Sequence, residues 1–216
     1  IQMLKAIPEG THPMLMLQSM VPLLDTEPRE SLTIPNDSED ALTGLIIAAR
    51  LPALVAAYYR RERGLEWPLT SYASDPIQGF LKSLHGEQAA EHVVEALKVA
   101  QILQMEHSYN AGTFAGRVAL STAAPMASSI SASMGTLFGK LHGGADQAAL
   151  ETAMAAGSPE RAGDYVREQL AAGNRIMGIG HREYSTLDPR AAVLKPLART
   201  VCVSDEDLNL LNTLEA

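Results

Sequence analysis

Two histidines in glycine-rich segments are the residues of this sequence best suited to chemistry. His142 lies in GKLHGGAD, and His181 lies in GIGHREYSTLDPRA. Glycines let a ligand approach the backbone closely, and an imidazole can give or take a proton near neutral pH. Arg190 follows directly after Pro189, and its guanidinium could hold a carboxylate through two parallel hydrogen bonds. The combination favours a reaction on a small keto-acid whose carbonyl oxygens are polarised by imidazoles.

Each of these histidines also has a purely structural explanation. His142 could satisfy a backbone carbonyl in a tight glycine turn, and His107, in MEHSYNAGTFAGR, could face the negative end of a helix dipole. The pattern around His181 is longer, because Gly178 and Gly180 precede it and DPR follows it. Taken together, the segments predict one shared site, in which His107 donates a hydrogen bond to a substrate oxygen.

The remaining histidines have no comparable setting. His12 precedes Pro13 at the expected start of a helix, His85 lies at a helix end before Gly86, and His92 lies on a polar helix face. We expect all three to be structural or solvent-facing. The nine methionines are typical of core packing. No spacing of histidine, cysteine and carboxylate suggests a metal site, so none is expected.

Composition and charge narrow the class of protein. With 46% hydrophobic and 19% charged residues, the 216-residue chain is expected to be globular and soluble, with no uninterrupted apolar run long enough to cross a bilayer. The single cysteine, Cys202, cannot form an internal disulfide, which favours the cytoplasm. The formal charge of −8 argues against a nucleic-acid surface. Arg60, Arg61 and Arg63 form a basic cluster, which we interpret as a solvated helix end.

The elements that must position these residues are predicted to be helices. Apolar side chains recur at three- and four-residue intervals, whereas β-branched alternation is rare, so the fold class is all-α. Pro52 predicts a kink in the first helix, and the stretch Thr113–Leu141, rich in small residues, predicts a central helix that allows close packing. The predicted helices are Leu42–Tyr59, Glu91–Met105, Thr113–Leu141, Asp146–Ala156, Pro159–Ala172, Arg190–Val201 and Asp205–Leu214.

The segments EHSYNAGTFAGR, LHGGAD and IMGIGHREYSTLDPRA, with the small-residue stretch between them, together resemble citrate synthases of the bacterial and archaeal type. The resemblance implies a multihelical fold with a large and a small helical domain, an active site in the cleft between them, and a homodimer. Residues 1–142 would belong to the large domain, without its N-terminal part. Residues 143–216 would belong to the small domain, without its C-terminal part.

The resemblance also implies a reaction and roles for residues. Acetyl-CoA would condense with oxaloacetate, and citryl-CoA would then be hydrolysed to citrate and CoA, with no cofactor besides the CoA substrate. His142 would stabilise the enol of acetyl-CoA, and His181 would donate to the oxaloacetate carbonyl. His107 and Arg190 would bind oxaloacetate. The backbone of four residues would help to hold CoA: Met177, Gly178, Ile179 and Gly180.

The sequence departs from the family pattern at several points. The aspartate base of the family is expected beyond Ala216, so the chain is interpreted as an internal portion of a longer one. Asp146 replaces the asparagine of HGGAN, and Ser185 stands where many members have a basic residue. Two alternatives therefore remain open. One is a 2-methylcitrate synthase that uses propionyl-CoA, and the other is a non-catalytic helical dimer that binds ligands.

Overall fold

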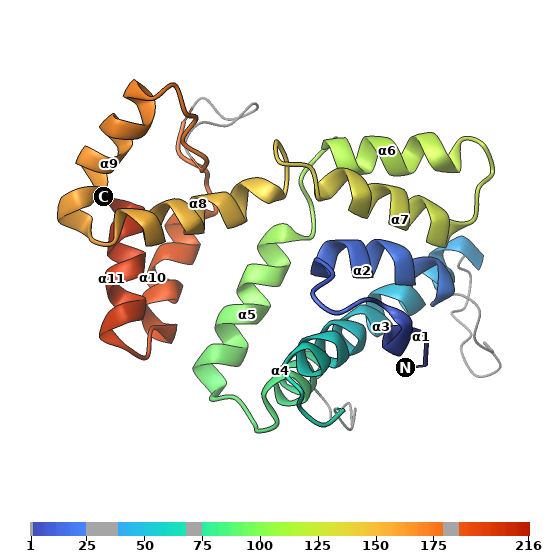
Figure 1. Ribbon diagram of the computed structural model, residues 1–216. Helices are drawn as coiled ribbons and strands as arrows, with labels where there is room; N and C mark the ends of the chain where they lie inside the picture. Colours follow the sequence, from blue (N-terminus) through green and yellow to red (C-terminus); the bar gives the residue numbers. More distant parts are fainter. Residues whose placement is uncertain (1, 25–38, 68–74, 179–185) are drawn as a thin grey trace. The chain divides into compact units, whose positions relative to one another are not determined.

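The protein is helical throughout the part that the structure describes. The computed structural model describes residues 2–24, 39–67, 75–178 and 186–216, which contain helices and no strands (Figure 1). This confirms the all-α prediction. In chain order the helices are α1 (Gln2–Ala6), α2 (Pro13–Met20), the 3-10 turn η1 (Val21–Leu23), α3 (Glu39–Glu62), α4 (Pro76–His85), α5 (Glu91–Gln104), α6 (Ala111–Leu120), α7 (Met126–Leu137), α8 (Gly144–Ala156), α9 (Pro159–Ala171), α10 (Ala191–Val201) and α11 (Asp205–Glu215).

The helices group into two compact units. Unit 1 comprises Ile1–Ala89 and His107–Phe138, and unit 2 comprises Ala90–Glu106 and Gly139–Ala216. Helix α5 therefore packs with the C-terminal helices, although it lies between α4 and α6 in the sequence. The domain boundary expected after His142 stays a prediction.

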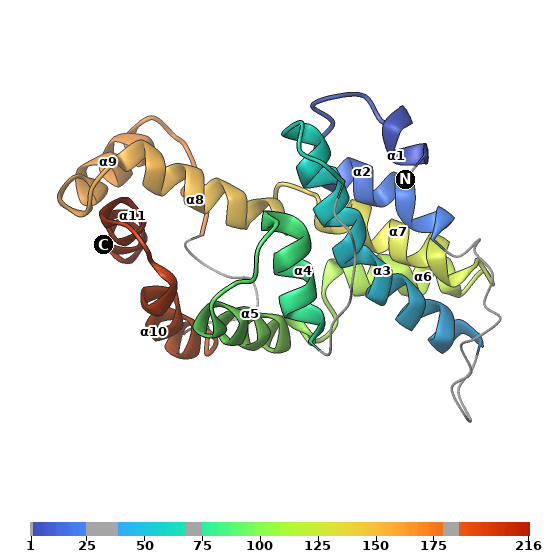
Figure 2. The ribbon, with the colours of Figure 1, turned by 90° about the horizontal axis from the view of Figure 1, so that it is seen from below.

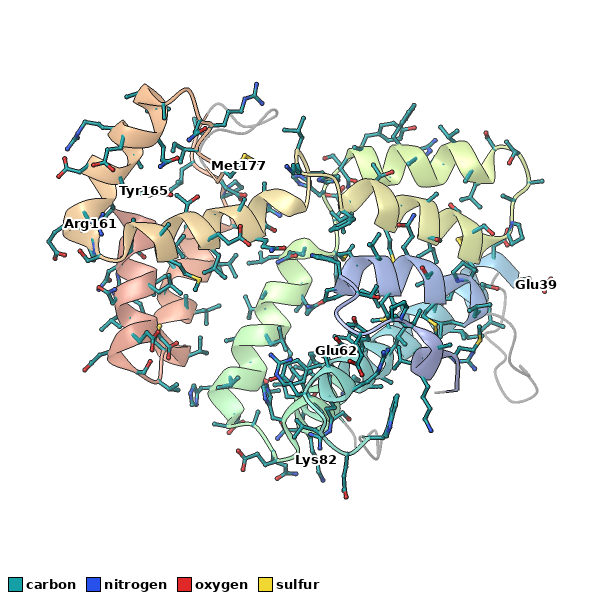
Figure 3. The ribbon with its side chains drawn as sticks, in the orientation of Figure 1. Glu39, Glu62, Lys82, Arg161, Tyr165 and Met177 are labelled. Atoms are coloured by element: carbon teal, nitrogen blue, oxygen red, sulfur yellow. The ribbon has the colours of Figure 1, made fainter. Side chains whose placement is uncertain are left out.

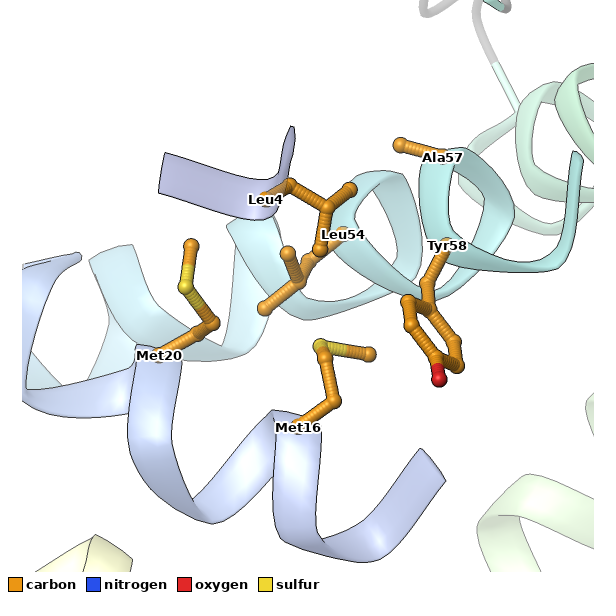
Figure 4. Close-up of a cluster of buried hydrophobic side chains, with 6 residues drawn as sticks. All are labelled: Leu4, Met16, Met20, Leu54, Ala57 and Tyr58. Carbon is orange, nitrogen blue, oxygen red and sulfur yellow. The ribbon is translucent and has the colours of Figure 1, made fainter. Parts of the chain in front are cut away.

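Helices α1, α2 and α3 enclose the main core of unit 1. Six buried side chains make up this core: Leu4, Met16, Met20, Leu54, Ala57 and Tyr58 (Figure 4). A second cluster joins Val21 and Ile47 to Ala127 of α7. Burial raises the pKa of Tyr58, and its hydroxyl donates a hydrogen bond to the carbonyl of Thr11. Buried side chains of α3 therefore pack against α1, α2 and η1, which precede it in the chain, and against α7, which follows it.

Helix α3 is long and apolar enough, by length and composition alone, to cross a membrane. Its apolar run is interrupted by Arg50, which donates to the carbonyl of Leu24, and Pro52 lies inside the helix. Several of its residues, including Ile46 and Ile47, are buried. In this structure α3 is the core helix of unit 1.

Two arginines of the basic cluster at the end of α3 bind backbone carbonyls of neighbouring segments. Arg61 donates to the carbonyls of Leu4, at 2.6 Å, and Ile7. Arg60 donates to the carbonyl of Leu84 near the end of α4, at 3.3 Å. The interpretation of this cluster as a solvated helix end is therefore wrong for Arg60 and Arg61. Carbonyls at helix ends lack partners within the helix, and long cationic side chains can satisfy them from a neighbouring element.

The predicted central helix Thr113–Leu141 is two helices. Helix α6 ends at Leu120, Ala123 adopts a φ of 59°, and Pro125 caps the start of α7. A proline disfavours helical backbone in the residue before it, so the chain turns here and α7 returns along α6 (Figure 1).

The small residues of this pair allow the close packing that their composition predicts. A Cβ placed on Gly116 would lie 2.3 Å from Oγ of Ser133 and 3.2 Å from Oγ of Ser129. The Ser129 hydroxyl donates to the carbonyl of Gly116 at 2.6 Å. A larger residue at position 116 would separate the two helices.

Unit 2 has a core of small side chains. Helix α11 packs on α8 and α9, and α10 packs on α5 (Figure 2). Ala153, Ala156, Ala162 and Thr213 are buried between these elements. The side-chain amide of Asn209 donates to the carbonyl of Gly157, which joins α11 to the end of α8. Because alanine side chains are small, the helix axes can lie close together. The packing of these helices therefore depends more on the fit between their surfaces than on a large buried area.

Helix α11 begins with a reciprocal capping box. The Asp207 N–H donates to Oγ of Ser204, and the Asp207 carboxylate accepts from the Ser204 hydroxyl at 2.8 Å and from the Ser204 N–H at 3.1 Å. Hydrogen bonds from the Ser204 hydroxyl and from the Val203 N–H lower the pKa of Asp207 below its usual value of 3.8. The predicted helix Asp205–Leu214 is thus confirmed as α11, with Ser204 as its N-cap.

This lowered pKa sets the pH at which the capping box contributes. The stabilisation is complete above the pKa of the unfolded aspartate, and it is lost as the pH falls through the lower folded pKa. Ser204→Ala is expected to reduce the free energy of unfolding of the full-length protein by about 1 kcal/mol at pH 7. The difference from the unsubstituted protein should narrow between pH 5 and about pH 3. Urea titrations of both proteins at pH 5 and at about pH 3 check this. An equal difference in the free energy of unfolding at the two pH values would contradict it.

Candidate active site

His142 lies in a series of tight turns that lead from α7 into α8. Its backbone N–H donates to the carbonyl of Gly139 at 2.9 Å, and its own carbonyl accepts from the Ala145 N–H at 3.1 Å. The Nε2 atom of His142 is buried and has no hydrogen-bond partner within the described parts of the chain. A buried polar atom without a partner is costly in a folded protein, and such atoms are typical of ligand sites. The structural explanation, a backbone carbonyl bound at this nitrogen, finds no support.

Gly178, the last described residue before the gap at 179–185, packs against α8. Gly178 has a φ of +87°, and a Cβ placed on it would lie 2.7 Å from Cβ of Ala149 in α8. Only glycine fits this combination of backbone conformation and close approach. Met177, labelled in Figure 3, is half-buried next to it. The structure therefore brings Met177 and Gly178, predicted to bind CoA, to the helix that begins directly after the His142 turn.

Three predicted site residues, Ile179, Gly180 and His181, lie outside the described residues, as does Ser185. Their roles stay predictions. The described chain resumes at residue 186, shortly before the DPR sequence. That sequence can be placed, and it belongs to unit 2 together with His142.

Arg190 is held by an aspartate two residues before it. Its Nη2 lies 2.6 Å from Oδ2 of Asp188, and its Nε lies 3.0 and 3.1 Å from the two carboxylate oxygens. The backbone N–H of Arg190 donates to the same carboxylate at 2.9 Å and so closes a turn at the start of α10. The guanidinium is thus held by Asp188, and its side chain is partly exposed.

His107 lies between α5 and α6 and is half-buried. Ser108 next to it has a φ of 51°, and the side chain of Asn110 caps α6 by accepting from the Thr113 N–H at 3.0 Å. Helix α5 ends at Gln104 and α6 begins at Ala111, so Asn110 caps the second helix after this break. His107 belongs to unit 1, whereas His142 belongs to unit 2, and each is described within its own unit. That these rings converge on one substrate stays a prediction.

The other histidines have the settings expected from the sequence. His12 caps α2, where its Nδ1 accepts from the Met14 N–H at 3.2 Å and its ring lies 4.4 Å from that of Phe138. His85 ends α4, with its ring 6.2 Å from that of Tyr59. His92 is exposed. These three are structural or solvent-facing, as predicted.

The sequence analysis missed two residues that shape this region. Asp188 was part of the DPR pattern, and an aspartate before proline at a helix start could have signalled a turn that binds the residue after the proline. Ala149 carries no such signal, because the need for a small side chain there arises only from its contact with Gly178.

Comparison with known proteins places these motifs in a family. The family described as "Citrate synthase, C-terminal domain" matches residues 1–216, the whole chain. The chain belongs to the citrate synthase family. Among citrate synthases and their relatives, "Citrate synthase 2" of Bacillus subtilis is 37% identical over 193 residues, which cover 88% of this chain and 51% of that protein. "Citrate synthase" of Mycolicibacterium smegmatis is 34% identical over 218 residues, 99% of this chain and 58% of that protein.

One relative carries a different name. A "2-methylcitrate synthase" of Mycobacterium tuberculosis is 34% identical over 200 residues, which cover 90% of this chain and 49% of that protein. The sequence identity to the two relatives named citrate synthase, 37% and 34%, is therefore close to the 34% identity to the relative named 2-methylcitrate synthase. The chain spans about half the length of the curated relatives that it matches.

Solved citrate synthases share the fold. The crystal structure of citrate synthase from Thermotoga maritima gives a TM-score of 0.80 at 29% identity and covers 99% of this chain and 56% of that one. The ternary complex of carboxymethyl coenzyme A and oxaloacetate with citrate synthase from Thermoplasma acidophilum gives 0.81 at 26% identity, over 98% of this chain and 55% of that one.

Proposed function

We propose that the protein containing this chain condenses acetyl-CoA with oxaloacetate and hydrolyses the resulting citryl-CoA. The observation that carries this proposal is the buried Nε2 of His142, which has no partner among the described residues and precedes the helix against which Gly178 packs. Membership of the citrate synthase family supports it. The proposal includes a cytoplasmic location and no cofactor besides the acyl-CoA, which is itself a substrate.

The residues divide the chemistry between them. The methyl carbon of acetyl-CoA loses a proton to a carboxylate base, and the new enol carbon then bonds to the carbonyl carbon of oxaloacetate. His142 donates a hydrogen bond to the enol oxygen, which stabilises charge as it develops. His181 gives a proton to the oxaloacetate oxygen, which becomes a hydroxyl. Water then cleaves the thioester and releases citrate and the CoA thiol.

Arg190 and His107 hold oxaloacetate during this sequence. A guanidinium binds a carboxylate through charge-assisted hydrogen bonds, which are about twice as strong as neutral ones. The net charge of −8 repels a dianion overall, so such local cationic groups must supply the attraction. The backbone at Met177 and Gly178 holds the acyl-CoA beside α8.

An assay on the full-length protein can determine which acyl-CoA it prefers as a substrate. We propose acetyl-CoA as the preferred substrate. One methylene group changes the discrimination by only about 1–3 kcal/mol, and relatives of both kinds match this chain, so the two acyl-CoAs need direct comparison. The kcat/KM for acetyl-CoA is expected to exceed that for propionyl-CoA. The reverse order would identify a 2-methylcitrate synthase, and calorimetric binding of oxaloacetate without turnover of either thioester would favour the non-catalytic alternative.

We also propose that the protein is a homodimer that uses the outer face of α6. Phe114 and Val118 are 54% and 51% exposed on this face, and the Tyr109 ring lies 5.9 Å from that of Phe114. Exposed apolar residues that are contiguous in this way mark interaction surfaces.

The proposed dimer interface can be tested by a substitution that introduces a charge on this face of α6. Phe114→Asp is expected to halve the mass of the full-length protein in light scattering, because an unpaired buried carboxylate is costly at an interface. Leu170→Asp on α9, at a site that is also exposed, is the matched control and should leave the mass unchanged. A dimer that persists in Phe114→Asp would place the interface elsewhere.

A further inference from the structure

Gly178 rests on α8 while its own backbone is exposed. The methyl group of Ala149 fills the space that a side chain on Gly178 would take, since a Cβ there would lie 2.7 Å from Cβ of Ala149. Gly178 itself is exposed. Within the described parts of the chain, the backbone N–H groups of Met177 and Gly178 donate to no other residue. Backbone donors that are exposed in this way can bind a ligand directly.

Helix α8 is anchored independently of this contact. Its buried alanines pack in the core of unit 2, and its C-terminal end is tied to α11 through the side chain of Asn209. The helix begins two residues after His142, and Ala149 lies five residues beyond the first residue of the helix, about 7.5 Å along its axis. Helix α8 is therefore a rigid support, with His142 at its start and the backbone of Gly178 against its side.

We propose that Ala149 is a positioning residue for acyl-CoA. Its methyl group sets how far the backbone of Met177 and Gly178 lies from α8, and therefore where the CoA is held relative to His142. This inference rests on the proposed function, which takes that backbone to bind acyl-CoA. Ala149 acts through this backbone rather than through a contact with the substrate.

Two substitutions of Ala149 separate the effect of size from that of a changed residue. The χ1 angle of valine is nearly fixed in a helix, so its added methyl groups cannot turn freely away from Gly178. Serine adds a single atom, and its hydroxyl can turn back to the carbonyl of Ala145, four residues earlier. Ala149→Val should therefore displace the backbone at Gly178, whereas Ala149→Ser should leave it in place.

The experiment combines steady-state kinetics of the full-length protein with calorimetric binding of free CoA. In Ala149→Val, the KM values for acetyl-CoA and propionyl-CoA and the Kd for CoA are expected to rise together by at least about 10-fold. The KM for oxaloacetate should change by less than about 2-fold, because the displaced backbone does not bind oxaloacetate. Ala149→Ser should change each of these constants by less than about 2-fold.

Ala155→Val is the matched control for the added bulk. Ala155 lies on the same helix as Ala149 and is exposed. A valine at an exposed helical position costs only a few tenths of a kcal/mol in helix propensity. This variant is expected to leave the kinetic constants and the affinity for CoA unchanged.

Four outcomes would overturn the inference. An unchanged KM for acetyl-CoA with an unchanged Kd for CoA in Ala149→Val would mean that the methyl group does not set the position of this backbone. A rise in KM for propionyl-CoA alone would place Ala149 against the acyl group. A parallel rise in the KM for oxaloacetate, with a lower melting temperature, would assign Ala149 a structural role.

The fourth outcome separates this inference from the proposed function. If the unsubstituted protein turns over neither thioester, the proposed function fails, and calorimetry with CoA then decides the role of Ala149. A weaker affinity for CoA in Ala149→Val supports that role. An equal affinity of the two proteins, or no binding of CoA by the unsubstituted protein, rejects it.

Discussion

Replacing His142 with alanine is expected to lower the kcat of the full-length protein by about 10²- to 10³-fold, the usual effect of removing one donor to a developing oxyanion. His181→Ala should lower kcat by a similar factor, because the oxaloacetate oxygen then lacks its proton donor. Both effects follow from proton positions in the transition state, so substrate binding should change less than turnover. Steady-state kinetics with acetyl-CoA and oxaloacetate measure both.

His92→Ala is the control for these two variants. His92 lies exposed on α5, far along the chain from the glycine-rich segments, and should tolerate alanine with a change in kcat of less than about 2-fold. Equal activity of His92→Ala and His181→Ala would show that the site has been misplaced. A full loss of structure is tested separately by circular dichroism of each variant.

Gly178→Ala is expected to be more damaging than the same change at any other described glycine of unit 2. The residue would be strained at a φ of +87°, at a cost of about 1–2 kcal/mol, and its Cβ would overlap that of Ala149 at 2.7 Å, which adds about 1–3 kcal/mol. The overlap can be relieved only if the chain at Met177 moves away from α8. We therefore expect a lower free energy of unfolding and a raised KM for acyl-CoA.

Two further variants separate the strain from the overlap. Gly173 has a φ of +77°, and no atom lies within 4 Å of the position that an added methyl group would take, so Gly173→Ala should show the strain alone. Adding Ala149→Gly to Gly178→Ala removes the overlapping methyl and should recover part of the lost stability. The double-mutant cycle from urea unfolding gives the coupling between the two positions. A coupling of zero would contradict the contact between Gly178 and α8.

Most helices could be predicted because their apolar periodicity and their caps lie within a short window of sequence. The predicted helix Glu91–Met105 corresponds to α5, and the predicted Asp205–Leu214 corresponds to α11, whose first turn depends on Ser204 and Asp207. The helix Thr113–Leu141 was predicted wrongly because the small residues on both sides of Pro125 share one composition. A single proline outweighed that composition, since it both breaks the helix and begins the next one.

The site could be predicted only in part. Glycines and histidines in short motifs mark His142 and the segment at Gly178, because a close approach and a proton donor each require particular residue types. Contacts between distant segments leave no such mark. The packing of Gly178 on Ala149 joins residues 29 positions apart, and the burial of Nε2 of His142 likewise appears only in the folded chain. The contact between Asp188 and Arg190 is intermediate in predictability. The two residues are close in the sequence, but the turn between them sets the geometry of their contact.

The central claim is that the imidazoles of His107, His142 and His181 and the guanidinium of Arg190 share one substrate site. A crystal structure of the full-length protein with oxaloacetate and carboxymethyl coenzyme A tests it most directly. We predict that His107, His181 and Arg190 lie within hydrogen-bond distance of the oxaloacetate, and that Nε2 of His142 faces the carboxymethyl group. Oxaloacetate bound away from these residues, or rings that face separate surfaces, would contradict the account.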